Sequence, residues 1–336
     1  MLRPFLAMSR FQLLSRVTCV SILLFLSGIN TSAQIRAEDP KPINAVQGIV
    51  AAFKQHPVVI IGEAHWLRQP GEFYISLIRD REFQEAVQDI VVEFASRNNQ
   101  PLLDKYIGGE NVPIQEVRHI WRDTTKVASW ESPISAEWLA AIRDVNESLP
   151  QTHKLRVLAG DTAVDWTQIR THADWEALGN NDISISEVIE NEVLKRRHRA
   201  LVVLGSNHVT KSGSRDGSNT TTRVEAHYPG STYVLLLLNA GPLRLALEDK
   251  LKLPSPNGPS VYELNGTSLA NVTDGNSPPL IRMTDALLYL AQRGAFTMAF
   301  PAAGSLEQEY LKEIDRRSLI EWGELRARKF LGPAAQ

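Results

Sequence analysis

Hydrophobic residues along this chain alternate between two spacings, one typical of helices and one typical of short buried strands. In residues 40–55 the apolar side chains recur three or four positions apart, whereas residues 57–61 form a continuous apolar run that ends at Gly62. The same alternation continues along the chain. We predict strands at residues 57–61, 89–93, 155–158, 200–204, 233–238 and 285–290. We predict helices at residues 40–55, 75–83, 100–106, 113–121, 135–148, 184–196 and 305–330.

Strands that are separated by helices predict an α/β fold with a mainly parallel sheet and helices on both of its faces. Three consecutive helical stretches lie between the second and third predicted strands, so we expect a helical insertion there. Residues 251–279 are rich in Pro, Gly, Asn and Ser and predict a long irregular excursion, and residues 305–330 predict a charged helical tail. There is no internal repeat and no sharp boundary, which favours a single domain with its core at residues 57–240.

The first 33 residues have the organisation of a secretory signal peptide. They contain three arginines and no acid, then the apolar run of residues 17–28, then Thr31-Ser32-Ala33 before Gln34. The apolar run has 12 residues, whereas a membrane span needs about 20. We therefore predict that residues 1–33 are cleaved and that residues 34–336 are exported, with no later segment that could span a membrane.

Without the signal the chain keeps 33 basic and 38 acidic residues, a net charge of −5. This mildly acidic balance supplies no surplus of positive charge for phosphates, so we exclude a nucleic-acid partner. The only cysteine, Cys19, lies in the predicted signal. Disulfides, thiolate metal sites and cysteine nucleophiles are then excluded from the mature protein. An exported chain without cysteine is more typical of a bacterial envelope, periplasmic or secreted, than of a eukaryotic secretory pathway.

Polar residues with chemical potential follow four of the predicted strands. The first strand is followed by Gly62-Glu63-Ala64-His65, the second ends in Glu93, the third is followed by Gly160-Asp161, and the fourth by Gly205-Ser206-Asn207-His208. The carboxyl ends of parallel strands meet at one edge of a sheet, so we expect these carboxylates and imidazoles to converge. We assign Asp165, a little further along, to the cap of a helix.

Such a cluster permits two kinds of chemistry. A histidine held by a glutamate can act as a general base for water while a second carboxylate donates a proton, which is a mechanism of hydrolysis. The same Glu63, His65, Glu93 and His208 could instead hold a divalent metal with an open position for water. The histidines lack the helical His-Glu-x-x-His spacing, and the sequence leaves both alternatives open. Nucleophile-elbow, phosphate-loop and dinucleotide motifs are absent.

The predicted insertion carries a second polar patch. Helical spacing places Arg118, Trp121 and Arg122 on one face. There the two guanidinium groups could bind a substrate carboxylate or pair with Glu93 or Asp161. The alternative is a solvated charged helix in which the tryptophan fills the core.

The two Gly-x-x-His motifs, Gly62-Glu-Ala-His65 and Gly205-Ser-Asn-His208, with Glu93 between them, resemble a known superfamily. It groups ChaN haem-uptake proteins, erythromycin esterases and Tiki/TraB proteins, and the resemblance covers roughly residues 57–240. The stretches Trp121-Arg-Asp-Thr-Thr125, Arg143-Asp-Val-Asn146 and Arg156-Val-Leu-Ala-Gly-Asp161 are similar to an uncharacterised bacterial branch of it.

This resemblance implies that Glu63, His65, Glu93 and His208 line the site. Esterase relatives imply that His65 is the base for water, although the short Gly-Glu-Ala-His spacing is that of ChaN rather than of the esterases. ChaN relatives imply haem binding, and Tiki relatives imply a metal-dependent protease. We therefore expect an exported hydrolase that acts on an ester or amide of a small molecule or peptide. The alternatives are a haem-binding iron-uptake protein and a catalytically silent envelope protein.

Overall fold

A computed structural model of the chain describes residues 37–214, 217–238, 257–273, 275, 277–292 and 294–335. The predicted signal at residues 1–33 lies outside the described residues, and so does part of the predicted excursion at residues 251–279. Among the residues described, no helix is long and apolar enough to cross a membrane.

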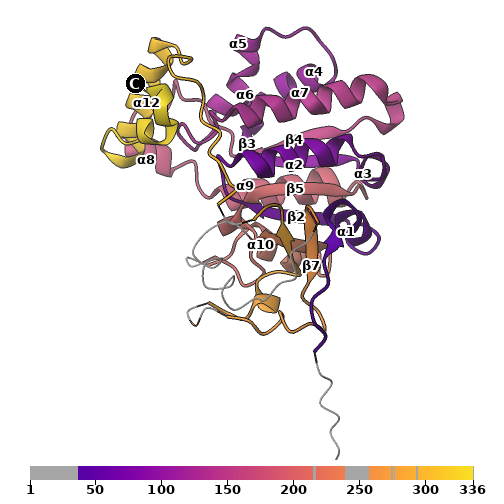
Figure 1. Ribbon diagram of the computed structural model, residues 1–336. Coiled ribbons are helices and arrows are strands. Elements are labelled where there is room, and N and C mark those ends of the chain that lie inside the picture. The colour runs from indigo at the N-terminus through magenta and orange to yellow at the C-terminus, as the bar shows by residue number, and fades with distance from the viewer. Residues whose placement is uncertain are drawn as a thin grey trace, which may run out of the picture. The chain divides into compact units, whose positions relative to one another are not determined.

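The described part of the chain is built on one eight-stranded sheet with the order β1-β7-β8-β6-β2-β5-β3-β4 (Figure 1). The parallel strands are β2 (Val58–Glu63), β3 (Asp89–Ser96), β4 (Arg156–Asp161), β5 (Ala200–Gly205), β6 (Thr232–Leu237) and β8 (Ala286–Tyr289). The short strands β1 (Ile43–Asn44) and β7 (Ser260–Glu263) are antiparallel. The predicted mainly parallel sheet is confirmed.

The order of the strands decides which strand ends are neighbours. β2 pairs in parallel with β5, with Glu63 opposite Gly205, and β3 pairs in parallel with both β5 and β4. The carboxyl ends of these four strands therefore share one edge of the sheet. β3 does not end at Glu93 as predicted but continues to Ser96, which pairs with Asp161 after a shift in register. Glu93 can be buried within this strand because the Gly205 N–H and His208 bind its carboxylate.

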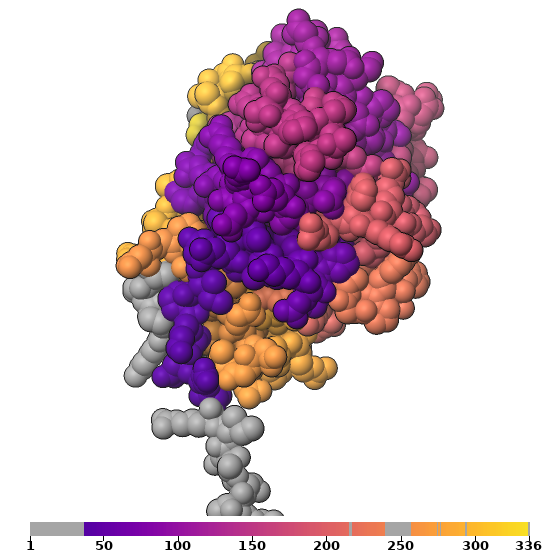
Figure 2. Space-filling view, turned by 90° about the vertical axis from the view of Figure 1, so that its right-hand side faces the viewer, coloured from indigo at the N-terminus to yellow at the C-terminus, as the bar shows by residue number. Residues whose placement is uncertain are grey.

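Helices cover both faces of the sheet, as predicted. On β2, Val59 and Ile61 pack into a core shared with α1 (Ala45–Ala52), α2 (Arg68–Arg79) and α3 (Arg81–Ala86). The alternate residues Val58 and Ile60 pack into a second core with α9 (Asn181–Val188) and α10 (Thr220–His227). Successive side chains of a strand point to opposite faces, so the continuous apolar run of β2 follows from burial on both sides. In Figure 2 the indigo N-terminal segments and the magenta insertion form one continuous surface.

The helical insertion between β3 and β4 is also confirmed. It contains α4 (Gln100–Ile107), α5 (Ile114–Val117), α6 (His119–Arg122) and α7 (Pro133–Ser148). The predicted helix at residues 113–121 is two short helices, α5 and α6, that meet at Arg118. α7 begins two residues before the predicted start at residue 135, with Ser132 as N-cap and Pro133 in the first turn, where a missing N–H costs nothing.

Three of the remaining predicted helices differ in detail. The helix predicted at residues 75–83 is divided at Asp80 between α2 and α3. α9 begins at Asn181, before the predicted start, and continues as the π-helix Ile189–Leu194. The predicted tail at residues 305–330 is α12 (Gln308–Trp322), followed by the 3-10 segment Ala327–Ala335. Gly323 ends α12 because it adopts a left-handed conformation with φ 70°. A short helix, α8 (His172–Glu176), lies beside α12.

Candidate active site

The strand ends bring four of the predicted residues, Glu63, His65, Glu93 and His208, into one cluster. Gly205 lies at its centre: its backbone N–H donates to Glu93 Oε2 at 2.8 Å. A Cβ atom added at Gly205 would lie 3.1 Å from Nε2 and Cε1 of His65. Glycine at this position therefore permits the imidazole to approach the end of β5.

His65 and Glu63 form a hydrogen-bonded dyad. His65 Nδ1 lies 2.7 Å from Glu63 Oε1, and this assigns the proton to Nδ1 when the ring is neutral. Nε2 makes no hydrogen bond within the described part of the chain, and the side chain is 31% exposed. Burial lowers the pKa of His65, but the hydrogen bond and charge of Glu63 and the charge of Glu93 outweigh it. The pKa consequently lies above its ordinary value of 6.5.

The backbone that carries His65 is held in an unusual conformation. The next residue, Trp66, has φ 72°, which is a strained value for a bulky side chain. Its carbonyl accepts a hydrogen bond from Ala299 N–H at 2.6 Å, and its ring packs against Phe300 with centroids 5.7 Å apart. On the other side, the ring of His65 contacts Trp130 edge-on at 4.3 Å. These contacts fix the imidazole from two directions.

His208 bridges two carboxylates. Its Nδ1 lies 2.9 Å from Asp182 Oδ1, and its Nε2 lies 3.3 Å from Glu93 Oε1. Burial lowers the pKa of His208, but these carboxylates outweigh it and raise the pKa to about 10. Burial likewise raises the pKa of Glu93, while His208, His65 and the Gly205 N–H lower it to about 2. At neutral pH the arrangement is an imidazolium between two carboxylates.

Asp182 is a site residue that the sequence did not reveal. Besides His208, it accepts hydrogen bonds from Thr220 N–H and Oγ1, each at 2.7 Å. It lies in the first turn of α9, directly after the Gly-Asn-Asn stretch at residues 179–181. A start of the helix at residue 181, which Asn180 signals as N-cap, would have placed Asp182 at this edge.

Asp161 is fully buried at the end of β4 and is hydrogen-bonded to the insertion. Its two oxygens accept from Thr125 N–H and Thr125 Oγ1, each at 2.6 Å. Burial raises the pKa of Asp161 to about 7, against the effect of these hydrogen bonds. Asp161 thus anchors residues 124–125 over the site. Asp165 does not cap a helix: its carboxylate caps a turn at Thr167, and the N-cap of α8 is Thr171.

The predicted pairing of the insertion arginines with Glu93 or Asp161 is wrong. Arg118 pairs with Glu307, and Arg122 pairs with Glu131 at 2.9 Å and with Glu307 at 3.1 Å. The guanidinium of Arg122 also stacks on Tyr310 at 3.7 Å. Trp121 is buried in the core. The sequence could not indicate Glu307 and Tyr310 as partners because they lie far along the chain. A role of these three residues in substrate binding stays a prediction.

The four clustered side chains do not fit a metal site in this arrangement. Among the described residues, no three His, Cys, Asp or Glu side chains are grouped so that they could hold a metal ion. Both nitrogens of His208 face carboxylates, and Glu93 is engaged by His208 and Gly205. The remaining uncommitted imidazole nitrogen of the cluster is Nε2 of His65.

Two pockets adjoin the cluster. A cavity of about 40 Å³ is bordered by Glu63, His65, Tyr74, Trp130 and Trp138. It is far smaller than the roughly 300–1,000 Å³ that small-molecule sites enclose, so it cannot bury a haem. A second pocket, of about 330 Å³, opens beside His208. It is large enough for part of a substrate.

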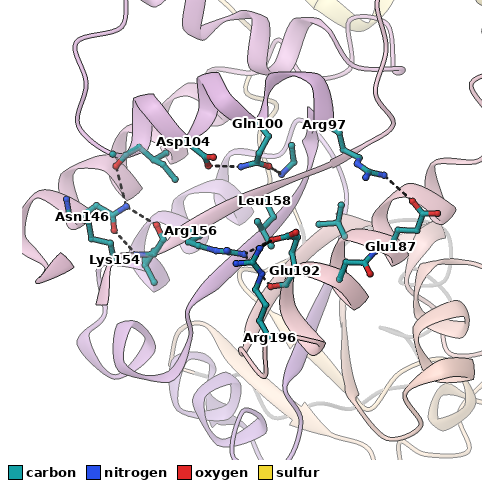
Figure 3. A pocket seen from close by; sticks show the side chains of 16 residues that line it. Arg97, Gln100, Asp104, Asn146, Lys154, Arg156, Leu158, Glu187, Glu192 and Arg196 are labelled. Carbon is teal, nitrogen blue, oxygen red and sulfur yellow. Dashed lines mark hydrogen bonds and ion pairs between the residues drawn. The ribbon is translucent and has the colours of Figure 1, made fainter. Parts of the chain in front are cut away.

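A wider groove of about 530 Å³ runs along the free edge of β4 and contains none of the predicted site residues (Figure 3). Two side-chain amides occupy this edge. Gln100 bonds to Ala159 N–H and Val157 C=O, at 2.7 and 2.8 Å, and Asn146 bonds to both the N–H and C=O of Leu155. These amides replace a neighbouring strand and protect the edge from pairing with another chain.

No family model matches this chain, and no curated protein matches its sequence. Three solved structures are similar to it. A Bacillus cereus protein has 12% identity over 78% of this chain and 97% of its own, with a TM-score of 0.50. The type III effector HopBA1 has 14% identity over 76% and 99%, with a TM-score of 0.42. ChaN of Campylobacter jejuni, solved with cofacial haem, has 11% identity over 75% and 98%, with a TM-score of 0.38. The Bacillus cereus protein shares the fold of this chain.

Proposed function

We propose that this protein hydrolyses an ester or amide, with His65 as the general base. The observation that carries the proposal is the dyad of His65 and Glu63 at the carboxyl ends of the central strands. Because Nδ1 donates its proton to Glu63, Nε2 is the basic nitrogen and lies uncommitted at the site. In parallel sheets, catalytic groups concentrate at this edge.

In the proposed reaction, Nε2 of His65 removes a proton from water while the water oxygen attacks the carbonyl carbon of the substrate. The carbonyl π electrons move to its oxygen and return when the C–O or C–N bond breaks. The leaving group takes the proton from Nε2. Glu63 stabilises the imidazolium that forms between the two steps.

His208 and Glu93 have a different role in this proposal. With a pKa near 10, His208 keeps its proton at neutral pH, so it supplies a positive charge rather than a base. Glu93, with a pKa near 2, has no proton to donate. His65 therefore also donates the proton to the leaving group. The His208–Glu93 pair binds the Gly205 N–H and contributes one positive and one negative charge to the site.

The test is a panel of ester and peptide substrates assayed with the mature chain, with and without a chelator. We expect His65→Ala to lower turnover by on the order of 100-fold or more, since it removes the base. His153→Ala, which changes an exposed histidine after α7, is the matched control. Activity lost to a chelator and restored by metal would instead favour the metal-dependent alternative.

The pH profile gives a second readout. A base must be unprotonated, so kcat/KM should rise with pH and level off above the pKa of His65, with a midpoint above 6.5. Glu63→Gln removes the hydrogen-bonding charge that raises this pKa. Its midpoint should move to lower pH, and an unchanged midpoint would contradict the assignment of His65 as base.

We further propose that the chain is a divergent member of the superfamily of ChaN, the erythromycin esterases and Tiki/TraB, exported after cleavage before Gln34. The intact mass of the exported protein tests the cleavage. The haem-uptake alternative rests on the uncommitted Nε2 of His65, which could ligate iron at the surface. It takes the place of hydrolysis if no substrate is cleaved, hemin binds stoichiometrically, and His65→Ala abolishes that binding. If the protein shows neither hydrolysis nor hemin binding, the silent envelope protein is favoured.

A further inference from the structure

The pocket beside His208 has the features of a binding site for a carboxylate group. It has a volume of about 330 Å³ and lies between residues 125–126 of the insertion, the end of α8 and the start of α9. Trp175 and Leu178 provide an apolar wall, and His208 connects the pocket to the candidate catalytic cluster. The pocket therefore borders the cluster on the side of His208.

Two donors of positive character line this pocket. Lys126 is half-buried, and its ammonium makes no ion pair within the residues that the structure describes. Asn181 is 7% exposed; its Oδ1 accepts from Thr162 N–H at 2.9 Å, while its buried Nδ2 has no acceptor in the described chain. The N-terminus of α9 offers no further donor, because Asp182 N–H donates to the Asn180 side chain at 2.8 Å and Ile183 N–H donates to the Asn180 carbonyl at 3.0 Å.

The other charges around the pocket are already paired. Both imidazole nitrogens of His208 face carboxylates, those of Asp182 and Glu93. Glu176 is 65% exposed and lies 3.5 Å from His172. Lys126 is the charged side chain of this lining that has no ion pair within the described residues. This balance suits a monoanion such as a carboxylate, and it disfavours a phosphate dianion.

We propose that this pocket binds a free carboxylate of the substrate through Lys126 and the Asn181 amide. This inference rests on the proposed hydrolase function and names its substrate class: an ester or amide whose acyl part ends in a carboxylate. The competing explanation is internal. Lys126 also lies near the buried Asp161 and Glu321, whose charges it would offset without any ligand. The two explanations predict different behaviour of substrates.

The first experiment compares two 4-nitrophenyl esters of equal acyl length, the hemiglutarate and the valerate. We expect kcat/KM to favour the hemiglutarate, and Lys126→Gln to reduce this ratio about tenfold, as the loss of a partly desolvated charge pair does. Lys126→Arg should preserve the ratio. Lys54→Gln is the control: it removes the same charge from an exposed lysine that precedes β2, at the opposite edge of the sheet.

Calorimetry with glutarate and glutaramide tests the pocket without any turnover. Glutarate should bind to the wild-type chain and glutaramide should not. Asn181→Asp keeps the acceptor for Thr162 but turns the donor into a negative oxygen, so it should abolish glutarate binding. Circular dichroism and thermal unfolding verify that each variant is folded.

The outcomes separate this inference from the proposed function. Glutarate binding that depends on Lys126 and Asn181, in a protein that cleaves no ester, supports the pocket and refutes the hydrolase. Ester cleavage without preference for the hemiglutarate, and no glutarate binding, overturns the pocket and leaves the hydrolase standing. Equal glutarate affinity in the wild type and in Lys126→Gln also overturns it and favours the internal role of Lys126.

Discussion

The protonated state of His208 should contribute a measurable, pH-dependent share of the stability of this protein. Its imidazolium lies between the carboxylates of Asp182 and Glu93, with side-chain exposures of only 20%, 9% and 3%, respectively. We perturb it with Glu93→Gln/His208→Gln, which replaces the charged pair by two amides. The double variant avoids leaving Glu93 as an unpaired buried carboxylate, and Asp182 keeps its hydrogen bonds from Thr220.

The magnitude follows from the pKa of His208, which is about 10 in the folded chain and 6.5 ordinarily. A raised pKa means that the folded state binds the proton more tightly, so the stabilisation is complete below pH 6.5 and is lost as the pH rises through 10. Each pH unit is worth about 1.4 kcal/mol, which gives about 5 kcal/mol in total and about 3 kcal/mol between pH 6.5 and 9. The depressed pKa of Glu93 gives about 3 kcal/mol for its share of the pair. The value for His208 is larger because it has two carboxylate partners.

The assay is urea unfolding at a series of pH values from 6.5 to 9, for the wild type and the double variant. Most other titrating groups are common to both proteins, so the difference between the two curves isolates the pair. We expect the free energy of unfolding of the wild type to fall by about 1.4 kcal/mol per pH unit relative to the double variant. An NMR titration should find the His208 ring protonated up to pH 9. Parallel unfolding curves would refute the reasoning, because they would mean that His208 is neutral in the folded chain.

Four further substitutions test the packing around the site and the edge of the sheet. Gly205→Ala places a methyl group 3.1 Å from the His65 ring, so we expect on the order of a tenfold loss of kcat/KM with the fold intact; unchanged kinetics would mean that the ring position is not critical. Tyr74→Phe removes a buried hydroxyl that has no partner within the described chain, and urea unfolding should find it neutral or up to about 1 kcal/mol more stable; a clear destabilisation would reveal a hidden partner. Gln100→Leu and Asn146→Leu should each cost about 1–3 kcal/mol and promote association through β4, measured by light scattering, whereas a monomeric and equally stable variant would show that the edge needs no capping.

The parallel core was predictable from the sequence because each of its strands is a continuous apolar run between helices. Such runs occur where a strand is buried on both faces, and β2, β5 and β6 satisfy this condition. The antiparallel strands β1 and β7 have only two and four residues, so no periodicity could reveal them. The extension of β3 was missed because Glu93 suggested the end of a strand. A buried carboxylate within a strand is rare unless it has partners, and here the partners come from β5 and His208.

The candidate site was predictable only as far as the topology of the sheet determines it. Glu63, His65, Glu93 and His208 could be placed together because each lies at or near the carboxyl end of a parallel strand, and this requires no knowledge of side-chain contacts.

Partners that come from other elements could not be inferred in this way. Asp182 lies 26 positions before His208, and Glu307 lies 189 positions after Arg118. A charged residue in a sequence indicates that a partner is needed but not where the partner lies. The arginines of the insertion were therefore assigned to the nearest acids at the site, whereas in the folded chain the helical tail supplies Glu307. The same reasoning explains why Lys126 and Asn181 were overlooked: neither ends a strand, and they meet only because Asp161 anchors the insertion over the edge of the sheet.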